Sequence, residues 1–192
     1  MSIAVPYLKK ALNSRFEGIH PDWEIDNVSI DSRSLQNNSG TLFFALPGQN
    51  RDGHDYITQL IEKGVLNFVV THIPENAFGK ANFFVVENTL KALQDFARWY
   101  RQQYTFPVIA ITGSCGKTIV KEWLNYLLSP DYNIIRSPKS YNSQVGVPLS
   151  VIGINEKHNL GIFEAGISTI NEMQKLEEII RPESSPSGSS PP

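Results

Sequence analysis

The 192-residue chain has a single cysteine, Cys115, and this scarcity limits its chemistry. One cysteine excludes a disulfide within the chain, which fits a reducing compartment. A helix N-terminus can lower the pKa of a thiol, but no His or Asp lies near Cys115 in the sequence to activate it. We therefore expect Cys115 to serve as a small residue beside a ligand and not as a nucleophile.

Long apolar runs and a strong charge are also missing. No apolar stretch approaches the ~20 residues that span a bilayer, and no N-terminal stretch combines a basic start with an apolar core. The formal net charge of -2 provides no electrostatic footprint for nucleic acid or an anionic membrane. We expect a cytoplasmic monomer that binds small molecules, with no nucleic-acid partner and no membrane insertion.

Patterns of metal-binding histidines and hydrolase carboxylates are missing as well. His20, His72 and His158 have no metal-ligand spacing, so we expect them on the surface or in loops. No pair of carboxylates stands out as a hydrolase site. The ten phenylalanines are more simply explained as core than as a stacking platform.

One stretch that is present is informative: the run VIAITGSCGKT from Val108 to Thr118. A buried strand that leads into a glycine-rich turn and then a helix directs backbone N–H groups at an anion. In a P-loop the lysine reaches the outer phosphates and the Ser/Thr hydroxyl holds Mg²⁺, which assigns roles to Lys117 and Thr118. The generic spacing G-x-x-x-x-G-K-[ST] is not met, because Gly113 and Gly116 are only three apart.

The same stretch is compatible with a plain strand-turn-helix connection whose lysine is solvated. The helix that follows favours phosphate binding, because its amphipathic pattern puts the turn at a helix N-terminus. The apolar residues on one face are Val120, Trp123, Leu124, Leu127 and Leu128. We therefore predict a nucleotide phosphate site in this loop.

Strands and helices alternate along the first hundred residues. β-rich apolar runs predict strands, and amphipathic runs bounded by turn signals predict helices. The expected helices are 3–12, the stretch from the Asp52-Gly53 turn to Gly64, and 89–104; the expected strands are 27–35, 41–48, 67–71 and 83–86. This alternation predicts a small α/β domain at 1–106, and Pro107 marks the start of the next domain.

The same pattern continues after the loop helix. Strands are expected at 133–135 and 160–163, a loop with an apolar segment between them, and a helix at 171–180. The strand at 160–163 delivers Glu164 at its carboxyl end, the edge where α/β sheets bind ligands. A lone acidic residue there is often a cap or a solvated group, but beside a phosphate loop it is a candidate Mg²⁺ ligand.

The second domain is expected to be incomplete. Residues 107–182 leave room for about three strands, whereas sheets commonly hold roughly five or six. The segment 183–192, which ends the chain in ESSPSGSSPP, has nothing apolar to bury. It is predicted to be a disordered or non-native tail.

Several motifs resemble those of the Mur ligases, the ATP-dependent amide-forming enzymes of peptidoglycan precursor synthesis. The family's compressed phosphate loop, T-G-x-x-G-K-[TS], matches residues 112–118. DSR at 31–33, G-x-L-F-F-A-L-x-G at 40–48 and DGHDYI at 52–57 are similar to the domain that holds the UDP end of the substrate. The implied fold class is α/β: a small N-terminal α/β substrate domain followed by the start of a P-loop-type parallel-sheet ATPase domain.

Within the family, the resemblance favours the member that adds D-Ala-D-Ala. VKE at 120–122 after the loop is similar to that member, as is YNSQVGVPLS at 141–150. EAGIS from Glu164 resembles the family's E-M-G-A-S. Trp123 and SPKSYNSQ at 137–144 also look like a branch in which the ligase is fused to an alanine racemase.

The resemblance implies a mechanism and a set of site residues. ATP, with Mg²⁺, activates the terminal carboxylate of UDP-N-acetylmuramoyl-tripeptide as an acyl phosphate, which the amine of D-Ala-D-Ala then attacks. The implied catalytic residue is Lys117, and the implied metal ligands are Thr118 and Glu164. The implied ATP-binding residues are Gly113, Ser114, Cys115, Gly116, Lys117 and Thr118, and the implied substrate-binding residues are Ser32, Arg33, His54 and Asn142.

Two departures from the family pattern bear on these roles. The family commonly has Asn at the position of Ser143, and its later segments, including the domain that binds the dipeptide, do not follow residue 182 here. We therefore expect weak or no turnover from this chain.

The alternative functions are those of the related ligase that adds the third amino acid, another P-loop NTPase or kinase, and a truncated module that only binds the UDP substrate. The residues 31–33 could equally form a turn with a surface ion pair.

Overall fold

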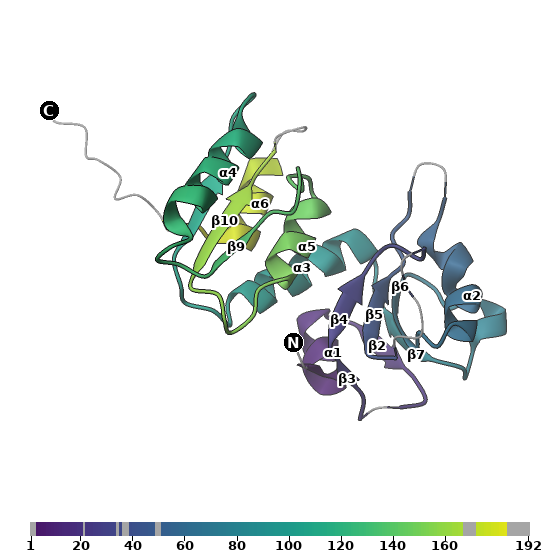
Figure 1. Ribbon diagram of the computed structural model, residues 1–192. Helices are drawn as coiled ribbons and strands as arrows, with labels where there is room; N and C mark the ends of the chain where they lie inside the picture. The colour runs from purple at the N-terminus through teal and green to yellow at the C-terminus, as the bar shows by residue number, and fades with distance from the viewer. Residues whose placement is uncertain are drawn as a thin grey trace, which may run out of the picture. The chain divides into compact units, whose positions relative to one another are not determined.

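The computed structural model describes residues 3–20, 22–33, 35, 39–48, 51–166 and 172–183. The chain divides into two compact units, Met1–Phe96 and Ala97–Pro192. Each unit is built from a largely parallel sheet and helices, which confirms the predicted α/β class (Figure 1). Among the described residues, no helix has the length and apolar character that crossing a membrane requires.

The first unit contains a five-stranded sheet in the order β2-β7-β6-β5-β4. Its parallel strands are β4 (Asn27–Ser29), β5 (Thr41–Phe44), β6 (Asn67–Val70) and β7 (Asn82–Val85), and its antiparallel edge is β2 (Arg15–Glu17). The short strands β1 (Ile3–Ala4) and β3 (Glu24–Ile25) pair separately. Parallel strands covered on both faces are continuously apolar, which explains the runs TLFF and NFVV.

Successive phenylalanines of this sheet pack on opposite faces, because side chains alternate along a strand. Phe43 lies in one cluster with Ile57 of α2 (Ile57–Glu62). Phe44 packs instead against Phe96 of α3 (Thr89–Arg101), with ring centroids 6.3 Å apart. These aromatic residues therefore form core, as predicted.

Two buried asparagines join the amino ends of β6 and β7. Asn67 and Asn82 are register partners, and Asn82 Nδ2 donates to Asn67 Oδ1 at 2.9 Å. Asn82 also accepts from the backbone N–H of His20 and donates to its carbonyl, each at 3.0 Å, while Asn67 Nδ2 donates to Ser39 O at 2.8 Å. These polar groups are satisfied inside the protein, as buried polar groups must be.

Some expected elements of the first unit differ in extent. The predicted helix over 3–12 is α1 (Val5–Ala11), because residues 3 and 4 pair as β1. The strand predicted over 27–35 ends at Ser29, and the chain then turns. The helix expected after the Asp52-Gly53 turn begins as the 3₁₀ segment η1 (Gly53–Tyr56) before α2, and a further 3₁₀ segment, η2 (Glu75–Ala77), was not predicted.

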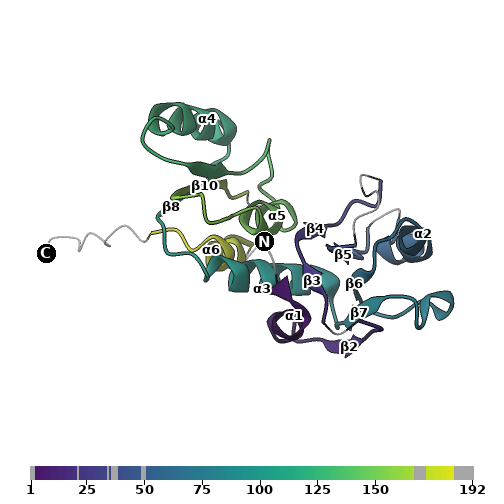
Figure 2. The ribbon, with the colours of Figure 1, turned by 60° about the horizontal axis from the view of Figure 1, so that its bottom comes forward.

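The second unit has three parallel strands in the order β8-β10-β9 among its described residues. They are β8 (Val108–Ile111), β9 (Ile134–Arg136) and β10 (Leu160–Glu164). Figure 2 shows α4 (Lys117–Leu128) on one face of this sheet and α5 (Gly146–Ile152) and α6 (Glu172–Ile180) on the other. The apolar segment predicted between the last two strands is thus the helix α5.

The apolar face of α4 points outward. Trp123 is 67% exposed, Tyr126 79% and Leu127 67%, whereas Lys121 on the inner side is fully buried. The amphipathic pattern therefore predicted the helix correctly, but it did not predict which face the sheet covers. The helix contacts all three strands of the sheet, and Leu124 and Leu128, two residues of the predicted apolar face, are half-buried.

The last turn of α3 belongs to the second unit. Arg101 Nε donates to Ile180 O at 3.0 Å and Nη1 donates to Tyr104 O at 2.6 Å. Tyr100 Oη donates to Ile154 O at 2.7 Å. These bonds explain why the two compact units divide after Phe96.

The domain limits 1–106, 107–182 and 183–192 stay a prediction, and residues 184–192 of the expected tail lie outside the described residues.

Candidate functional site

The glycine-rich loop connects β8 to α4 at the carboxyl edge of the second sheet. Gly113 and Gly116 have φ angles of +141° and +81°, which favour glycine over residues with a Cβ. Within the described part of the chain, no backbone hydrogen bond takes up the N–H groups of residues 113–116. Free N–H groups at a helix N-terminus are suitable donors for a phosphate.

The side chains of the loop are arranged around this turn. Lys117 Nζ donates to Gly113 O at 2.5 Å, so the lysine folds back across the loop. Thr118 Oγ1 donates to Glu164 Oε2 at 3.1 Å. The thiol of Cys115 is free and exposed.

Glu164 lies beside the loop because β10 pairs with β8. In that register Glu164 is the partner of Ile111, the residue at which β8 ends. The Glu164 side chain is 0% exposed, and its backbone N–H donates to Ser137 Oγ at 3.0 Å. The structure thus brings Glu164 to the edge that the strand pattern predicted, while its role as a metal ligand stays a prediction.

A lysine that sequence reasoning missed completes the cluster. Lys121 Nζ lies 2.9 Å from Glu164 Oε1, and both side chains are 0% exposed. The same ammonium donates to Ser137 O at 2.8 Å and to Lys139 O at 2.5 Å. One signal was available: Lys121 follows Thr118 by three residues, and that spacing puts both on one face of a helix.

The carboxylate and hydroxyl at this edge fit a Mg²⁺ ion held together with phosphates. Glu164 Oε1 is buried, and the only polar contact that the described part of the structure gives it is the Lys121 ammonium at 2.9 Å. Mg²⁺ takes one or two protein oxygens and completes its octahedron with phosphates and water. Among the described residues no group of three or more His, Cys, Asp or Glu could hold a metal ion. Phosphate oxygens would have to supply the remaining ligands.

Asn142 lies near Glu164 through the chain that follows β10. The N–H of Gly166 donates to Asn142 O at 2.7 Å, and a Cβ on Gly166 would lie 3.2 Å from Asn142 Oδ1. Ser143, which replaces the family's asparagine, accepts a hydrogen bond from the N–H of Gly146 at 3.1 Å. Ser143 therefore supports the start of α5, and the contact of Asn142 with substrate stays a prediction.

A pocket of about 350 Å³ lies after the carboxyl ends of β4 and β5 in the first unit. Its lining residues are Ile30, Asp31, Ser32, Arg33, Phe43, Leu46, Arg51, Gly53 and Tyr56. They combine two guanidinium groups with two aromatic rings, at the edge where parallel sheets bind ligands. Ser32 and Arg33 are the two predicted substrate residues that meet here.

Asp31 and Arg33 also form the turn with a surface ion pair that was the alternative expectation. Arg33 Nε and Nη2 donate to the two carboxylate oxygens of Asp31 at 2.9 and 2.8 Å. The guanidinium lowers the pKa of Asp31 to about 2. Because the Arg33 side chain is 83% exposed, it remains accessible to an anionic ligand.

His54, the third predicted residue for the UDP end, is buried next to this pocket's Gly53. Its Nε2 accepts from the N–H of Thr71 at 2.9 Å, so Nδ1 carries the proton and donates to Asp52 Oδ1 at 2.6 Å. Both ring nitrogens are used in tying the turn before α2 to the end of β6. A contact between His54 and the substrate stays a prediction.

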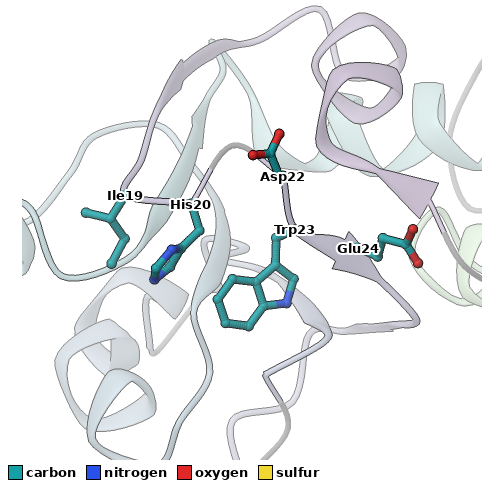
Figure 3. A pocket seen from close by; sticks show the side chains of 5 residues that line it. All are labelled: Ile19, His20, Asp22, Trp23 and Glu24. Atoms are coloured by element: carbon teal, nitrogen blue, oxygen red, sulfur yellow. The ribbon is translucent and has the colours of Figure 1, made fainter.

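A second pocket of the first unit, about 540 Å³, involves residues to which the sequence assigned no ligand. It is lined by Ile19, His20, Asp22, Trp23 and Glu24 (Figure 3). The rings of His20 and Trp23 lie side by side with centroids 5.0 Å apart, and the Asp22 carboxylate points away from them. His20 is exposed in a loop, as predicted, and His72 and His158 also lie in loops.

Comparison with family models matches both units. Residues 24–101 match the Mur ligase family, catalytic domain, and residues 111–185 match the Mur ligase middle domain. Curated relatives carry the name UDP-N-acetylmuramoyl-tripeptide--D-alanyl-D-alanine ligase. The relative from Synechocystis is 37% identical over 84% of this chain, and the relative from Rickettsia prowazekii is 36% identical over 88%. The chain spans 35% and 38% of their respective lengths.

Solved structures agree with these matches. MurF from Acinetobacter baumannii superposes with a TM-score of 0.85 and 27% identity, covering 95% of this chain and 40% of that one. MurF ligase from Thermotoga maritima in complex with ADP gives a TM-score of 0.72 and 26% identity, covering 81% and 35%. The fold of both units is therefore shared with these structures.

Proposed function

We propose a function from the premise that this chain belongs to the Mur ligase family. It carries the nucleotide-phosphate site and the UDP-substrate site of an ATP-dependent ligase that adds D-Ala-D-Ala to UDP-N-acetylmuramoyl-tripeptide. The proposal includes Mg²⁺ as the metal and a cytoplasmic monomer as the working form. The single observation that supports it best is the meeting of the compressed loop with Glu164, through the Thr118 hydrogen bond.

In this proposal the loop binds the phosphates of ATP. The N–H groups of residues 113–116 donate to phosphate oxygens, since nothing described in the protein uses them. Lys117 exchanges its bond to Gly113 O for the β- and γ-phosphates. Cys115 has no part in the proposed chemistry, because phosphoryl transfer from ATP to a carboxylate uses no protein nucleophile.

The chemistry needs positioning and charge neutralisation rather than a protein nucleophile. A carboxylate is a poor electrophile, so transfer of the γ-phosphoryl group to the tripeptide carboxylate, with release of ADP, creates a leaving group. The amine of D-Ala-D-Ala then attacks the acyl carbon and inorganic phosphate leaves. Mg²⁺, when bound by Thr118 and Glu164, neutralises phosphate charge, and Lys117 stabilises the charge in transfer.

The pocket of the first unit is proposed to bind the UDP end of the substrate. Arg33 and Arg51 supply positive charge for a diphosphate, while Tyr56 supplies aromatic surface for the uracil ring. Ser32 adds a hydroxyl at the same edge. Asn142, near Glu164 in the second unit, contacts the muropeptide.

Calorimetric titration of the chain tests the two sites separately. UDP-N-acetylmuramoyl-tripeptide should release heat with the unchanged chain and much less with Arg33→Ala, while Mg-ATP should respond to Lys117→Ala instead. Because each variant is the control for the other ligand, a general loss of folding is recognised. Absence of heat with the UDP substrate would count against the ligase assignment. The alternative function, another P-loop NTPase, would then be favoured.

A longer protein that also contains the dipeptide-binding region tests the reaction itself. Lys117→Ala should abolish ATP-dependent product formation there, and near-normal turnover would remove Lys117 from its proposed role. The 192-residue chain should show weak or no turnover. Detectable amide formation by that chain would contradict the expectation that the dipeptide site lies outside it.

A further inference from the structure

Lys121 has an unusual position for a lysine. Of the described side chains of α4, only Lys121 is fully buried, although lysine is almost never buried without a partner. Its ammonium is held by two carbonyls that follow β9, those of Ser137 and Lys139, and by the carboxylate of Glu164. The lysine therefore joins α4 to the ends of two neighbouring strands, at the edge that carries the phosphate loop.

The carboxylate that Lys121 contacts is the one assigned to the metal. Thr118 Oγ1 donates to one oxygen of Glu164 at 3.1 Å, and the Lys121 ammonium lies 2.9 Å from the other. Two cations that face one carboxylate repel each other, and this repulsion is stronger in a buried site than in water. Before nucleotide arrives, the negative charge of Glu164 is already neutralised, so a free divalent cation gains little there.

We propose that Lys121 makes binding of the divalent cation depend on the nucleotide. The ammonium is a built-in counter-ion that prevents Glu164 from capturing a free ion, and the phosphates then supply the negative charge that admits the metal. Lys121 is a positioning residue in this scheme, because it acts through Glu164 and touches no reacting atom. The inference rests on the proposed function for the role of the metal beside ATP.

Titration with Mn²⁺ in the absence of nucleotide tests the proposal directly, since Mn²⁺ binds the same oxygen ligands and its free form is measured by electron paramagnetic resonance. The unchanged chain should bind Mn²⁺ weakly. Lys121→Met keeps the length of the side chain but removes its charge, and should bind Mn²⁺ about tenfold more tightly. A purely structural role predicts the opposite sign, because a loosened site would bind the ion more weakly.

Three further variants make the result specific. Lys157→Met removes an exposed lysine of the same unit and should leave Mn²⁺ binding unchanged. The double variant Lys121→Met with Glu164→Gln should lose the gained affinity, which assigns the gain to that carboxylate. Lys121→Gln keeps a donor for the Ser137 carbonyl, and is the variant to be read if circular dichroism shows that Lys121→Met is unfolded.

The outcomes separate this proposal from the proposed function. Unchanged or weaker Mn²⁺ binding by the folded Lys121 variant would overturn the counter-ion role. A parallel titration of the unchanged chain with ADP and Mn²⁺ measures the nucleotide site, and absence of binding there would overturn the proposed function instead. Tighter Mn²⁺ binding by Lys121→Met without nucleotide, together with ADP-dependent binding by the unchanged chain, would support both.

Discussion

Lys121 and Glu164 depend on each other for their burial. Leaving one charge of a buried pair without its partner costs about 3–5 kcal/mol, so Glu164→Gln should lower the free energy of unfolding by that amount. The double variant with Lys121→Met should recover most of the loss, since neither charge is then buried alone. Urea unfolding followed by circular dichroism measures the stability of the unchanged chain, the two single variants and the double variant, which together form a double-mutant cycle.

The neighbouring Glu122 is a matched control for that experiment. Its carboxylate also approaches Lys121, at 3.4 Å, and contacts Arg136 at 3.1 Å, but it is about half exposed. Exposed ion pairs contribute between roughly zero and 1 kcal/mol, so Glu122→Gln should have little effect. Equal losses for the two substitutions would contradict a special role for the Glu164 pair.

His158 should make stability depend on pH. Burial lowers its pKa, and its Nδ1 accepts a hydrogen bond from the N–H of Asn155 at 3.1 Å, which protonation of that nitrogen would break. Because the folded chain binds this proton less readily than the unfolded chain, whose pKa is near 6.5, the stabilisation present above that pH is lost as the pH falls below it.

Thermal unfolding between about pH 8 and pH 5 measures this contribution. The unchanged chain should lose more stability across the range than His158→Gln, in which no group titrates at that position. Parallel curves for the two proteins would show that the shifted pKa of His158 does not contribute.

Lys121 also marks the limit of prediction at the residue scale. The edge shared by the loop and Glu164 followed from the sequence, because parallel strands present their carboxyl ends together. The burial of Lys121 did not, since its partners Ser137, Lys139 and Glu164 come from segments distant in sequence. Hydrophobic patterning assigns charged residues to water and has no means of finding a lysine that is paired inside.

At the scale of the elements, the end of α3 depends on one polar side chain, that of Arg101. Arg101 donates to the carbonyls of Ile180, Tyr104 and Phe106, and its guanidinium lies 5.4 Å from the Phe106 ring centroid. Arg101→Met would leave these carbonyls without their donor. We expect a loss of about 3 kcal/mol in the free energy of unfolding, measured by urea unfolding.

Lys91 provides the comparison on the same helix. It pairs with Asp95 at the surface, and such i,i+4 pairs contribute about 0.3–0.5 kcal/mol. Lys91→Met should therefore change stability only slightly. If Arg101→Met changed the free energy of unfolding as little, water would be replacing the guanidinium as donor to the three carbonyls, and the prediction would be wrong.

The elements themselves were predicted where periodicity and turn residues agreed. β5, β6 and β10 were recognised from short apolar runs, because a strand buried on both faces has this signature. β8 was recognised from the same kind of run, although only Val108 of this strand is buried. The segment 146–152 was not recognised as α5, because GVPLSVI is too short and too uniformly apolar to show a helical period. Its only polar side chain, Ser150, bonds back to Gly146 O at 2.8 Å.

For the whole molecule, the outward face of α4 has the clearest consequence. Trp123, Tyr126 and Leu127 form an exposed apolar surface, together with the exposed Ile119. Contiguous apolar surface of this kind favours association. The chain should bind the dye ANS, and Trp123→Gln with Tyr126→Gln should reduce the fluorescence without lowering the melting temperature.

A matched pair of substitutions makes that prediction specific. Tyr7→Gln and Phe78→Gln also remove exposed rings, but from the first unit. They should leave most of the ANS fluorescence. If instead they reduced it as much as the α4 substitutions, the dye would be reporting scattered exposed side chains rather than one surface.

The two candidate sites differ in how far the sequence could define them. The loop and Glu164 both lie at the carboxyl ends of parallel strands in one sheet, so their proximity could be predicted from the topology. The pocket of the first unit is assembled from residues 30–33, 43–46 and 51–56, and only the family resemblance singled out Ser32 and Arg33. Tyr56 and Arg51 were missed, because packing between separate loops decides which side chains face the pocket.

The buried amides of Asn67 and Asn82 have a consequence for how the first sheet assembles. These residues face each other only in the observed alignment of β6 and β7, in which their side chains bond to each other. Sliding one strand by a single residue would turn its amide to the opposite face, and buried donors and acceptors would lose their partners. Apolar side chains such as those of Phe68 and Phe83 tolerate several alignments. The asparagine pair therefore selects one alignment and disfavours misfolded forms of the sheet.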